Sequence, residues 1–309
     1  MSRARAKATV ITRRRLLHPR HWPLWLGLGL LWLITRLPHR AGMAIGRALG
    51  RLSYRLAKSR RHIAQVNVRL CFPELSEAER EALVRRNFEY TGMTVIEMGW
   101  AWWVGDERFA PLGEIQGLEH LQAALARGQG VLLVGGHFTS LEIAGRLLVP
   151  HANFPVTYRA HKNPVMEYIL RRARNRYYDS AIERHDVRGM IRALRKGMPV
   201  WYAPDQDYGR RHSVFVPFCG VSAATVTGTA RLAGMSKATI IPAQFYHRPD
   251  GRYQIILHPP LEGYPSGDEH ADAWRINAFI EEWVRQRPEQ YLWAHRRFKT
   301  RPEGEPRPY

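Results

Sequence analysis

From about residue 113 onward, short apolar runs alternate along the chain with longer amphipathic segments. Runs rich in Val, Ile, Leu and aromatic residues predict strands at residues 131–134, 155–158, 199–203, 239–246 and 253–257. Segments in which apolar positions recur every three to four residues predict helices at residues 141–148, 164–177, 187–196, 223–233 and 271–287. This alternation predicts a layered α/β domain over residues 113–309 with a mainly parallel central sheet.

The first residues of the chain follow a different pattern. Residues 1–21 form a basic arm, and residues 22–37 are rich in Leu and Trp and predict a membrane anchor helix. The uncharged part, residues 22–35, is shorter than the roughly 20 residues that a helix needs to cross a bilayer. It could span if Arg20 and Arg36 reach the headgroups, or it could lie flat in the interface. The pattern leaves both arrangements open.

Residues 38–112 are expected to be helical and to associate with the membrane. Over residues 43–61, Arg and Lys recur every four positions, while Leu and Ile occupy the other side of the helix. Such a helix is typical of anionic membrane surfaces, although a solvated face packed on the protein's own core gives the same pattern. A further helix is predicted to begin at Ser76, and the tryptophans of residues 100–103 indicate either packing or a lipid-facing surface.

Charge is distributed unevenly along the chain. The formal net charge is +20, yet no Asp or Glu precedes Glu74, and from there on 31 basic residues face 27 acidic ones. Nucleic-acid-binding proteins usually carry their basic residues on the folded recognition surface, so this distribution argues against a nucleic acid partner. Cys71 and Cys219 lack metal-ligand spacing, and we expect reduced thiols on the cytoplasmic side.

The most informative stretch is residues 131–142. A fully apolar strand runs into two glycines, then His137 and, five residues later, Glu142. Open α/β folds hold their ligands at the carboxyl ends of strands. His137 is therefore the candidate general base, and Glu142 is the candidate carboxylate on its other ring nitrogen. A structural interpretation stays open, because Thr139 and Glu142 fit a capping box and His137 could be a buried structural histidine.

Several catalytic motifs are missing from the chain. It has no G-x-S-x-G, P-loop, G-x-G-x-x-G or H-E-x-x-H motif. A histidine base with a carboxylate and without a protein nucleophile fits direct transfer of a group to a substrate hydroxyl. We therefore expect no covalent enzyme intermediate, no metal and no other cofactor.

Charged residues that follow other predicted strands are candidates for substrate binding. Arg159 and Lys162 come after the strand at residues 155–158, and Arg296 follows an apolar run near the end of the chain. Such cations can bind phosphate groups.

Two carboxylates, Asp205 and Asp207, follow the predicted strand at residues 199–203. They could ligate a metal, but two carboxylates in a turn more often make Asx-turn contacts. Asp205 is counted here among the substrate-binding candidates.

The spacing from His137 to Glu142 matches the H-x4-D/E signature of the glycerolipid and lipid A acyltransferases. From about residue 16 to residue 309 the chain resembles the late acyltransferases of lipid A biosynthesis. The segments that carry this resemblance are residues 17–20, 67–76 (NVRLCFPELS), 158–164, 201–209 (WYAPDQDYG), 214–218 and 290–304 (QYLWAHRRFKTRPEG). The family often has Asp where this chain has Glu142, which keeps the charge and adds one methylene.

The resemblance implies an α/β fold similar to that of the glycerolipid acyltransferases, preceded by a membrane helix. It implies an inner-membrane enzyme with a cytoplasmic catalytic domain that moves a fatty acyl chain from acyl carrier protein to a hydroxyacyl chain of (Kdo)2-lipid IV-A. The run at residues 295–304 is more similar to the lauroyl-type branch than to the myristoyl-type branch. His137 would deprotonate the acceptor hydroxyl and Glu142 would orient the imidazole. Taken with the analysis of the residues above, the candidate substrate-binding residues are Arg159, Lys162, Asp205 and Arg296.

Two other functions remain open. A glycerophospholipid acyltransferase would share the same histidine and carboxylate, but its single phosphate would need fewer converging Arg and Lys residues. A non-catalytic protein that binds anionic membranes would explain the first 73 residues but not the glycine turn before His137.

Overall fold

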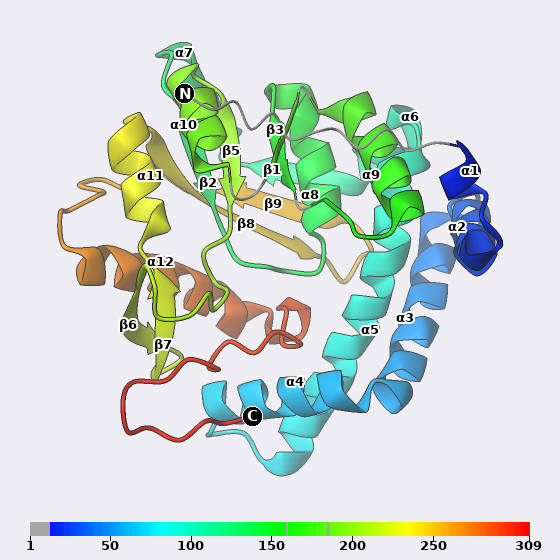
Figure 1. The fold of residues 1–309 in the computed structure, drawn as a ribbon, viewed down its shortest axis with the longest axis horizontal. Helices are drawn as coiled ribbons and strands as arrows, with labels where there is room; N and C mark the ends of the chain where they lie inside the picture. Colours follow the sequence, from blue (N-terminus) through cyan, green and yellow to red (C-terminus); the bar gives the residue numbers. More distant parts are fainter. Residues whose placement is uncertain (1–12, 159, 179, 184–185) are drawn as a thin grey trace.

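The computed structural model describes residues 13–158, 160–178, 180–183 and 186–309 (Figure 1). At its centre lies a five-stranded sheet with the strand order β1-β9-β8-β2-β5. Its strands are β1 (Gly113–Gln116), β2 (Val131–Val134), β5 (Pro199–Tyr202), β8 (Thr239–His247) and β9 (Tyr253–Leu257). Neighbouring strands run parallel, except that β8 and β9 are antiparallel. The predicted mainly parallel sheet is confirmed.

The rest of the α/β part surrounds this sheet. Strand β3 (Pro155–Tyr158) pairs in parallel with β4 (Ser180–Glu183), and β6 (Ser213–Phe218) forms a hairpin with β7 (Val221–Val226). The helices are α7 (Leu118–Ala126), α8 (Leu141–Leu148), α9 (Pro164–Tyr177), α10 (Val187–Arg195), α11 (Gly228–Ser236) and α12 (Glu269–Gln286), with the short 3-10 helices η2 (Ala110–Leu112), η3 (Val149–His151) and η4 (Pro288–Gln290).

One predicted helix, at residues 223–233, is wrong in its first third. Residues 223–226 belong to β7, and α11 begins only at Gly228. The reason is the hairpin turn at Cys219 and Gly220, where φ is positive at both residues (52° and 74°). Such a turn directs the chain straight back along the preceding strand, so pairing with β6 determines the structure here.

The N-terminal region is helical, as predicted. Its helices are α1 (Arg13–Leu16), η1 (Pro19–His21), α2 (Trp22–Ile34), α3 (His39–Leu56), α4 (Lys58–Cys71), α5 (Glu77–Trp103) and α6 (Asp106–Phe109). The helix expected over residues 43–61 is in fact two helices, because the backbone leaves the helical region at Ala57. The predicted start at Ser76 is confirmed, since Ser76 and Glu79 form a reciprocal capping box.

Helices α3 and α5 lie side by side in contact through glycines (Figure 1). A Cβ atom placed on Gly92 of α5 would lie 2.2 Å from the carbonyl oxygen of Gly46 and 2.4 Å from the amide nitrogen of Gly50, both in α3. No side chain fits between these backbones. The leucines of α3, in contrast, point away from this contact: Leu49, Leu52 and Leu56 are exposed.

The tryptophan cluster at the end of α5 packs inside the protein. Trp100 and Trp102 are buried in the core, which confirms packing as their role over exposure to lipid. At the other end of this region, α2 has 13 residues. Across the described ranges, no helix is both long enough and apolar enough to cross a bilayer, so the spanning arrangement considered for residues 22–37 is not found.

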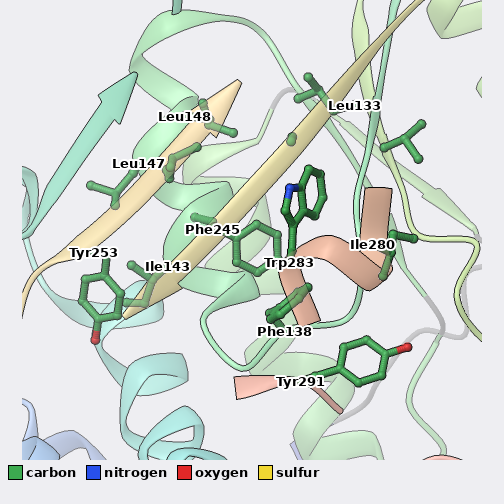
Figure 2. Packing of buried hydrophobic residues seen from close by; sticks show 14 of the residues in the cluster. Leu133, Phe138, Ile143, Leu147, Leu148, Phe245, Tyr253, Ile280, Trp283 and Tyr291 are labelled. Carbon is green, nitrogen blue, oxygen red and sulfur yellow. The ribbon is translucent and has the colours of Figure 1, made fainter. Parts of the chain in front are cut away.

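The core lies around the central strands. All four residues of β2 are buried, as the uninterrupted apolar run predicts. Figure 2 shows the aromatic side chains below the end of this strand, where the Phe138 ring lies 6.1 Å from that of Phe245 and 5.4 Å from that of Tyr291. Trp283 and Ile280 of α12 complete the packing. His137, which follows β2 and its two glycines, therefore lies next to a tightly packed part of the core.

Candidate active site

The two glycines after β2 allow the chain to turn within a crowded space. A Cβ atom on Gly135 would lie 2.4 Å from the Trp201 ring and 2.5 Å from the carbonyl oxygen of Ala243. A Cβ atom on Gly136 would lie 2.9 Å from a methyl group of Ile280. Only glycine fits such close approaches. The turn brings His137 to the carboxyl edge of the sheet, where open α/β folds bind their ligands.

A C-terminal strap, residues 288–298, holds this turn in place. The His137 carbonyl oxygen accepts a hydrogen bond from the Leu292 amide at 2.9 Å, and the Thr139 amide donates to the Gln290 carbonyl oxygen at 2.9 Å. From the other side, the hydroxyl of Thr94 in α5 donates to the carbonyl oxygen of Thr139 at 3.0 Å. The backbone on both sides of the His137 ring is thus fixed.

Two buried asparagines fix the strap in turn. Asn87 in α5 donates from Nδ2 to the carbonyl oxygens of Glu289 (2.9 Å) and Tyr291 (2.7 Å). Asn67 in α4 donates in the same way to two further strap carbonyls, each at 2.7 Å. The helical region is therefore part of the scaffold of the site.

His137 is paired with Asp205, which follows β5. Nδ1 of the ring lies 2.5 Å from Oδ1 of Asp205, and the His137 amide donates to Oδ2 at 2.7 Å. The Asp205 side chain is 1% exposed, whereas that of His137 is 27% exposed. Because Nδ1 is engaged, Nε2 is the ring nitrogen that can exchange a proton with a substrate.

The two side chains change each other's affinity for protons. Burial raises the pKa of Asp205, but the charge and hydrogen bonds of His137 outweigh this effect and lower it to about 2. Burial lowers the pKa of His137, but the charge and hydrogen bond of Asp205 outweigh it, and the pKa is raised. The nearby Tyr291 side chain makes a smaller contribution in the same direction and also lowers the pKa of Asp205. The carboxylate of Asp205 thus makes the His137 ring a stronger base than burial alone would allow.

The predicted contact between Glu142 and the His137 ring is wrong. Asp205 occupies Nδ1, and the Glu142 carboxylate instead lies 3.8 Å from the guanidinium of Arg174 in α9. Glu142 stands in the first turn of α8, one residue after its start at Leu141, and faces α9. Burial raises the pKa of Glu142, partly offset by the charge of Arg174.

The alternative capping box is not formed either. The residue before α8 is Ser140, whose side chain does not cap the helix. The hydroxyl oxygens of Thr139 and Ser140 are buried without a hydrogen-bond partner among the described residues.

The other predicted site residues lie in different environments. Lys162 and Arg296 are exposed, and the Arg296 guanidinium lies 5.8 Å from the centre of the Tyr309 ring. Among the contacts of the described residues, none joins these two cations to His137. Arg159 lies outside the described residues. Asp205, expected to bind substrate, is instead buried behind the histidine.

Asp207 has the structural role that the sequence favoured. Its carboxylate accepts hydrogen bonds from the Gly209 amide at 2.8 Å and from the amide and hydroxyl of Thr300 at 2.8 and 2.9 Å. It therefore ties the loop after β5 to the end of the chain. Over the described part of the chain, no group of three His, Cys, Asp or Glu residues could hold a metal ion.

An apolar pocket of about 100 Å³ lies between the sheet and helices α8 and α9. Leu133 of β2 and Trp201 of β5 form part of its wall, and Glu142 and Arg174 contribute the charged groups. At Gly145, an added Cβ would lie 2.8 Å from the Tyr178 hydroxyl, so glycine leaves space there between the helices. Most of the other side chains that line the pocket are apolar or aromatic, which suits an apolar ligand.

The comparisons with known proteins agree with this geometry. Residues 10–300 match the sequence profile of bacterial lipid A biosynthesis acyltransferases. The chain belongs to this family. It is 46% identical to the lipid A biosynthesis lauroyltransferase of Escherichia coli, over 95% of this chain and 97% of that protein. It is 42% identical to the palmitoleoyltransferase of the same organism, over 94% and 96%, and 34% identical to the myristoyltransferase, over 94% and 91%.

A lipid A acyltransferase is an acyl-transferring enzyme, as the resemblance in the sequence implied. Among solved structures, the chain is similar to the 1-acyl-sn-glycerophosphate acyltransferase of Thermotoga maritima, with 13% identity and a TM-score of 0.37, over 79% of this chain and 99% of that one.

Sequence reasoning missed the pairing of His137 with Asp205. The sequence did contain a signal for this pairing. Each of the two residues comes shortly after a predicted strand, and the carboxyl ends of neighbouring parallel strands lie at the same edge of a sheet. What the sequence could not give was that β2 and β5 are neighbours in the sheet. The scaffold roles of Asn67 and Asn87 had no comparable signal.

Proposed function

We propose that this acyltransferase moves a fatty acyl chain, lauroyl, from acyl carrier protein to a hydroxyacyl chain of (Kdo)2-lipid IV-A. The observation that carries the proposal is the His137–Asp205 pair at the carboxyl edge of the sheet, together with an apolar pocket that Leu141 and Glu142 of the following helix help to line. The identity to relatives named lauroyl-, palmitoleoyl- and myristoyltransferases supports a fatty acyl donor, and the highest of the three identities supports lauroyl.

In the proposed mechanism His137 is the general base. Asp205 holds the proton on Nδ1, so that Nε2 takes the proton of the acceptor hydroxyl. The resulting alkoxide attacks the thioester carbonyl and forms a tetrahedral intermediate. When this collapses, the carbon–sulfur bond breaks, the ester remains on the acceptor, and the leaving thiolate takes the proton from Nε2. No covalent bond to the enzyme forms.

Glu142 remains a proposed site residue, with a role other than orienting the imidazole. Its partly buried carboxylate and Arg174 form the polar part of the apolar pocket. We propose that the two fix α8 against α9 and so keep the pocket open for the acyl chain. The first-turn amides of α8 and the cation of Arg159 are proposed to stabilise the oxyanion.

The phosphates of the acceptor are proposed to bind basic side chains on the surface. Lys162 and Arg296 are exposed, as this role requires. Arg159 is the third proposed ligand. One guanidinium group can donate two parallel hydrogen bonds to a phosphate. Arg159 and Arg296 would therefore contribute more to phosphate binding than Lys162.

The enzyme is proposed to lie on the cytoplasmic surface of the inner membrane through α2 and α3. Large apolar side chains on these helices face outward: Leu26 of α2 is 77% exposed, Leu30 58% and Leu56 of α3 71%. Exposed apolar surface of this extent is typical of membrane or protein contact sites. Arginines on α3, at positions 47, 51 and 55, would attract anionic headgroups.

The function is tested with purified enzyme in detergent, a set of acyl carrier protein thioesters of different chain lengths, and two acceptors. We expect one added acyl group on (Kdo)2-lipid IV-A, fastest with the lauroyl donor, detected by mass spectrometry. Equal or faster acylation of lysophosphatidic acid would instead identify a glycerophospholipid acyltransferase. Binding of the lipid without any transfer would favour the non-catalytic function.

A further inference from the structure

A second hollow, of about 500 Å³, lies outside the site described above. It is lined by helices α10 and α11 and by the loop that follows β5. Nothing in the proposed mechanism uses it. Its surface, its charge and its position together indicate what binds there.

The floor of this hollow, here called the α10–α11 groove, is apolar and open to solvent. Val187 at the start of α10 is 49% exposed, Tyr208 in the loop is 50% exposed, and Met235 near the end of α11 is 56% exposed. Met190 and Leu232 are buried beneath them. A groove between two helices with apolar side chains along it is the usual receptor for an amphipathic helix.

The rim of the α10–α11 groove is positively charged. Arg211, His212 and Arg231 line it, and the outer face of α10 adds three exposed arginines, at positions 188, 192 and 195. Two of these cations are paired with carboxylates, Arg231 with Glu269 at 2.9 Å and Arg192 with Asp186 at 3.8 Å. Among the described residues, no carboxylate contacts Arg211, whose Nε lies 3.1 Å from the His212 ring. This rim fits an acidic partner.

The α10–α11 groove is connected to the catalytic pair through a short piece of chain. Tyr208 is three residues after Asp205, so their Cα atoms are at most about 11 Å apart. A flexible arm reaching from a protein in this groove could therefore deliver its end to His137. The loop also carries Asp207, which anchors it to the end of the chain.

The position of the groove argues for a soluble partner. Helices α10 and α11 lie at one end of the molecule and α2 and α3, with their exposed leucines, at the other (Figure 1). With α2 and α3 on the membrane, the helices of the α10–α11 groove lie at the end of the molecule away from it.

We infer that the α10–α11 groove is the docking site of the small, acidic, helical protein that carries the acyl thioester. One of its acidic helices would lie in the groove with apolar residues on Val187 and Met235 and carboxylates on Arg211. This inference rests on the proposed function, because it requires a protein-bound donor.

The test measures binding and turnover with lauroyl-acyl carrier protein for the wild type and for two independent variants. Arg211→Glu reverses a rim charge, and Val187→Asp places a charge on the apolar floor at a helix start, where Asp is compatible with the helix. We expect each to raise Kd and KM about tenfold or more with kcat within twofold of the wild type. The matched control is Arg69→Glu, an exposed arginine at the hollow between α4 and α5, which should leave both constants unchanged.

The outcomes separate the two proposals. Unchanged Kd and KM in both variants, with unfolding midpoints like that of the wild type, would overturn the docking site. An equal effect of Arg69→Glu would show a general attraction of charges and would also overturn it. Failure of the wild type to use any carrier-bound thioester would refute the proposed function instead. If one of the two variants fails to fold, Kd and KM of the other variant decide whether the docking site is correct.

Discussion

Replacing Asp205 by Asn changes one atom in the structure and should remove most of the activity. The carboxylate accepts two hydrogen bonds, one from the His137 amide and one from Nδ1. An amide has only one oxygen to offer. If that oxygen keeps the His137 amide, the NH2 group faces Nδ1, which must then be unprotonated. The ring proton moves to Nε2, and the base is lost.

The size of the effect follows from the role of the base. General base catalysis typically contributes about 10²- to 10⁴-fold to the rate, or roughly 3 to 5 kcal/mol of transition-state stabilisation. We expect a loss of about that size in kcat for Asp205→Asn. KM should change little, because the Asp205 side chain is buried behind the histidine and does not face the substrates.

The pH profile gives an independent readout of the same pair. His137 acts as a base only when neutral, so kcat/KM should rise as pH increases through its pKa, which lies above the usual 6.5 because of Asp205. In Asp205→Asn the charge that raises the pKa is gone while burial remains, so the inflection of the residual activity should move to lower pH.

The matched control is Glu142→Gln. Glu142 lies next to Arg174 and not next to the His137 ring. The inflection of kcat/KM against pH in Glu142→Gln should therefore lie at the same pH as in the wild type. An Asp205→Asn enzyme with more than a tenth of wild-type kcat and an unmoved inflection would refute the assigned pair. If Glu142→Gln moved the inflection instead, Glu142 would be the partner of the ring.

Three further predictions concern the scaffold and the membrane face. Gly92→Ala should lower the free energy of unfolding by about 3 kcal/mol, because its Cβ would meet the α3 backbone, whereas Gly29→Ala, with open space around it, should not; thermal unfolding in detergent compares them. Asn87→Ala leaves two strap carbonyls without their donor and should cost about 2 to 4 kcal/mol of stability and lower kcat; normal unfolding with full activity would contradict this. Leu26→Glu combined with Leu30→Glu should release the protein from vesicles containing anionic lipid in a flotation assay, and unchanged binding would exclude α2 from the membrane contact.

Much of the α/β part could be predicted because the central strands β2, β8 and β9 are buried on both faces. Strand β2, for example, is an uninterrupted apolar run between two glycines. Both of its faces are covered, so no polar positions interrupt the run. Prediction failed at β7, where Ala and Ser have little preference of their own and the turn at Gly220 decides the structure. There, pairing with β6 outweighs the local pattern.

The site could be predicted only in part, for a related reason. The glycine turn and His137 are contiguous in the sequence, so their chemistry is visible there. Asp205 is 68 residues away, and its contact with His137 depends on β2 and β5 being neighbours. The nearest carboxylate along the sequence, Glu142, was therefore the natural choice, but helix α8 turns it toward Arg174.

Mass spectrometry of the acceptor lipid after incubation with lauroyl-acyl carrier protein, wild-type enzyme or His137→Ala tests the central claim most directly. We predict one added lauroyl group on (Kdo)2-lipid IV-A with the wild type. With His137→Ala of equal thermal stability, we predict transfer at least about 100-fold slower. Transfer by His137→Ala within a few-fold of the wild-type rate would contradict the assignment of His137 as the base.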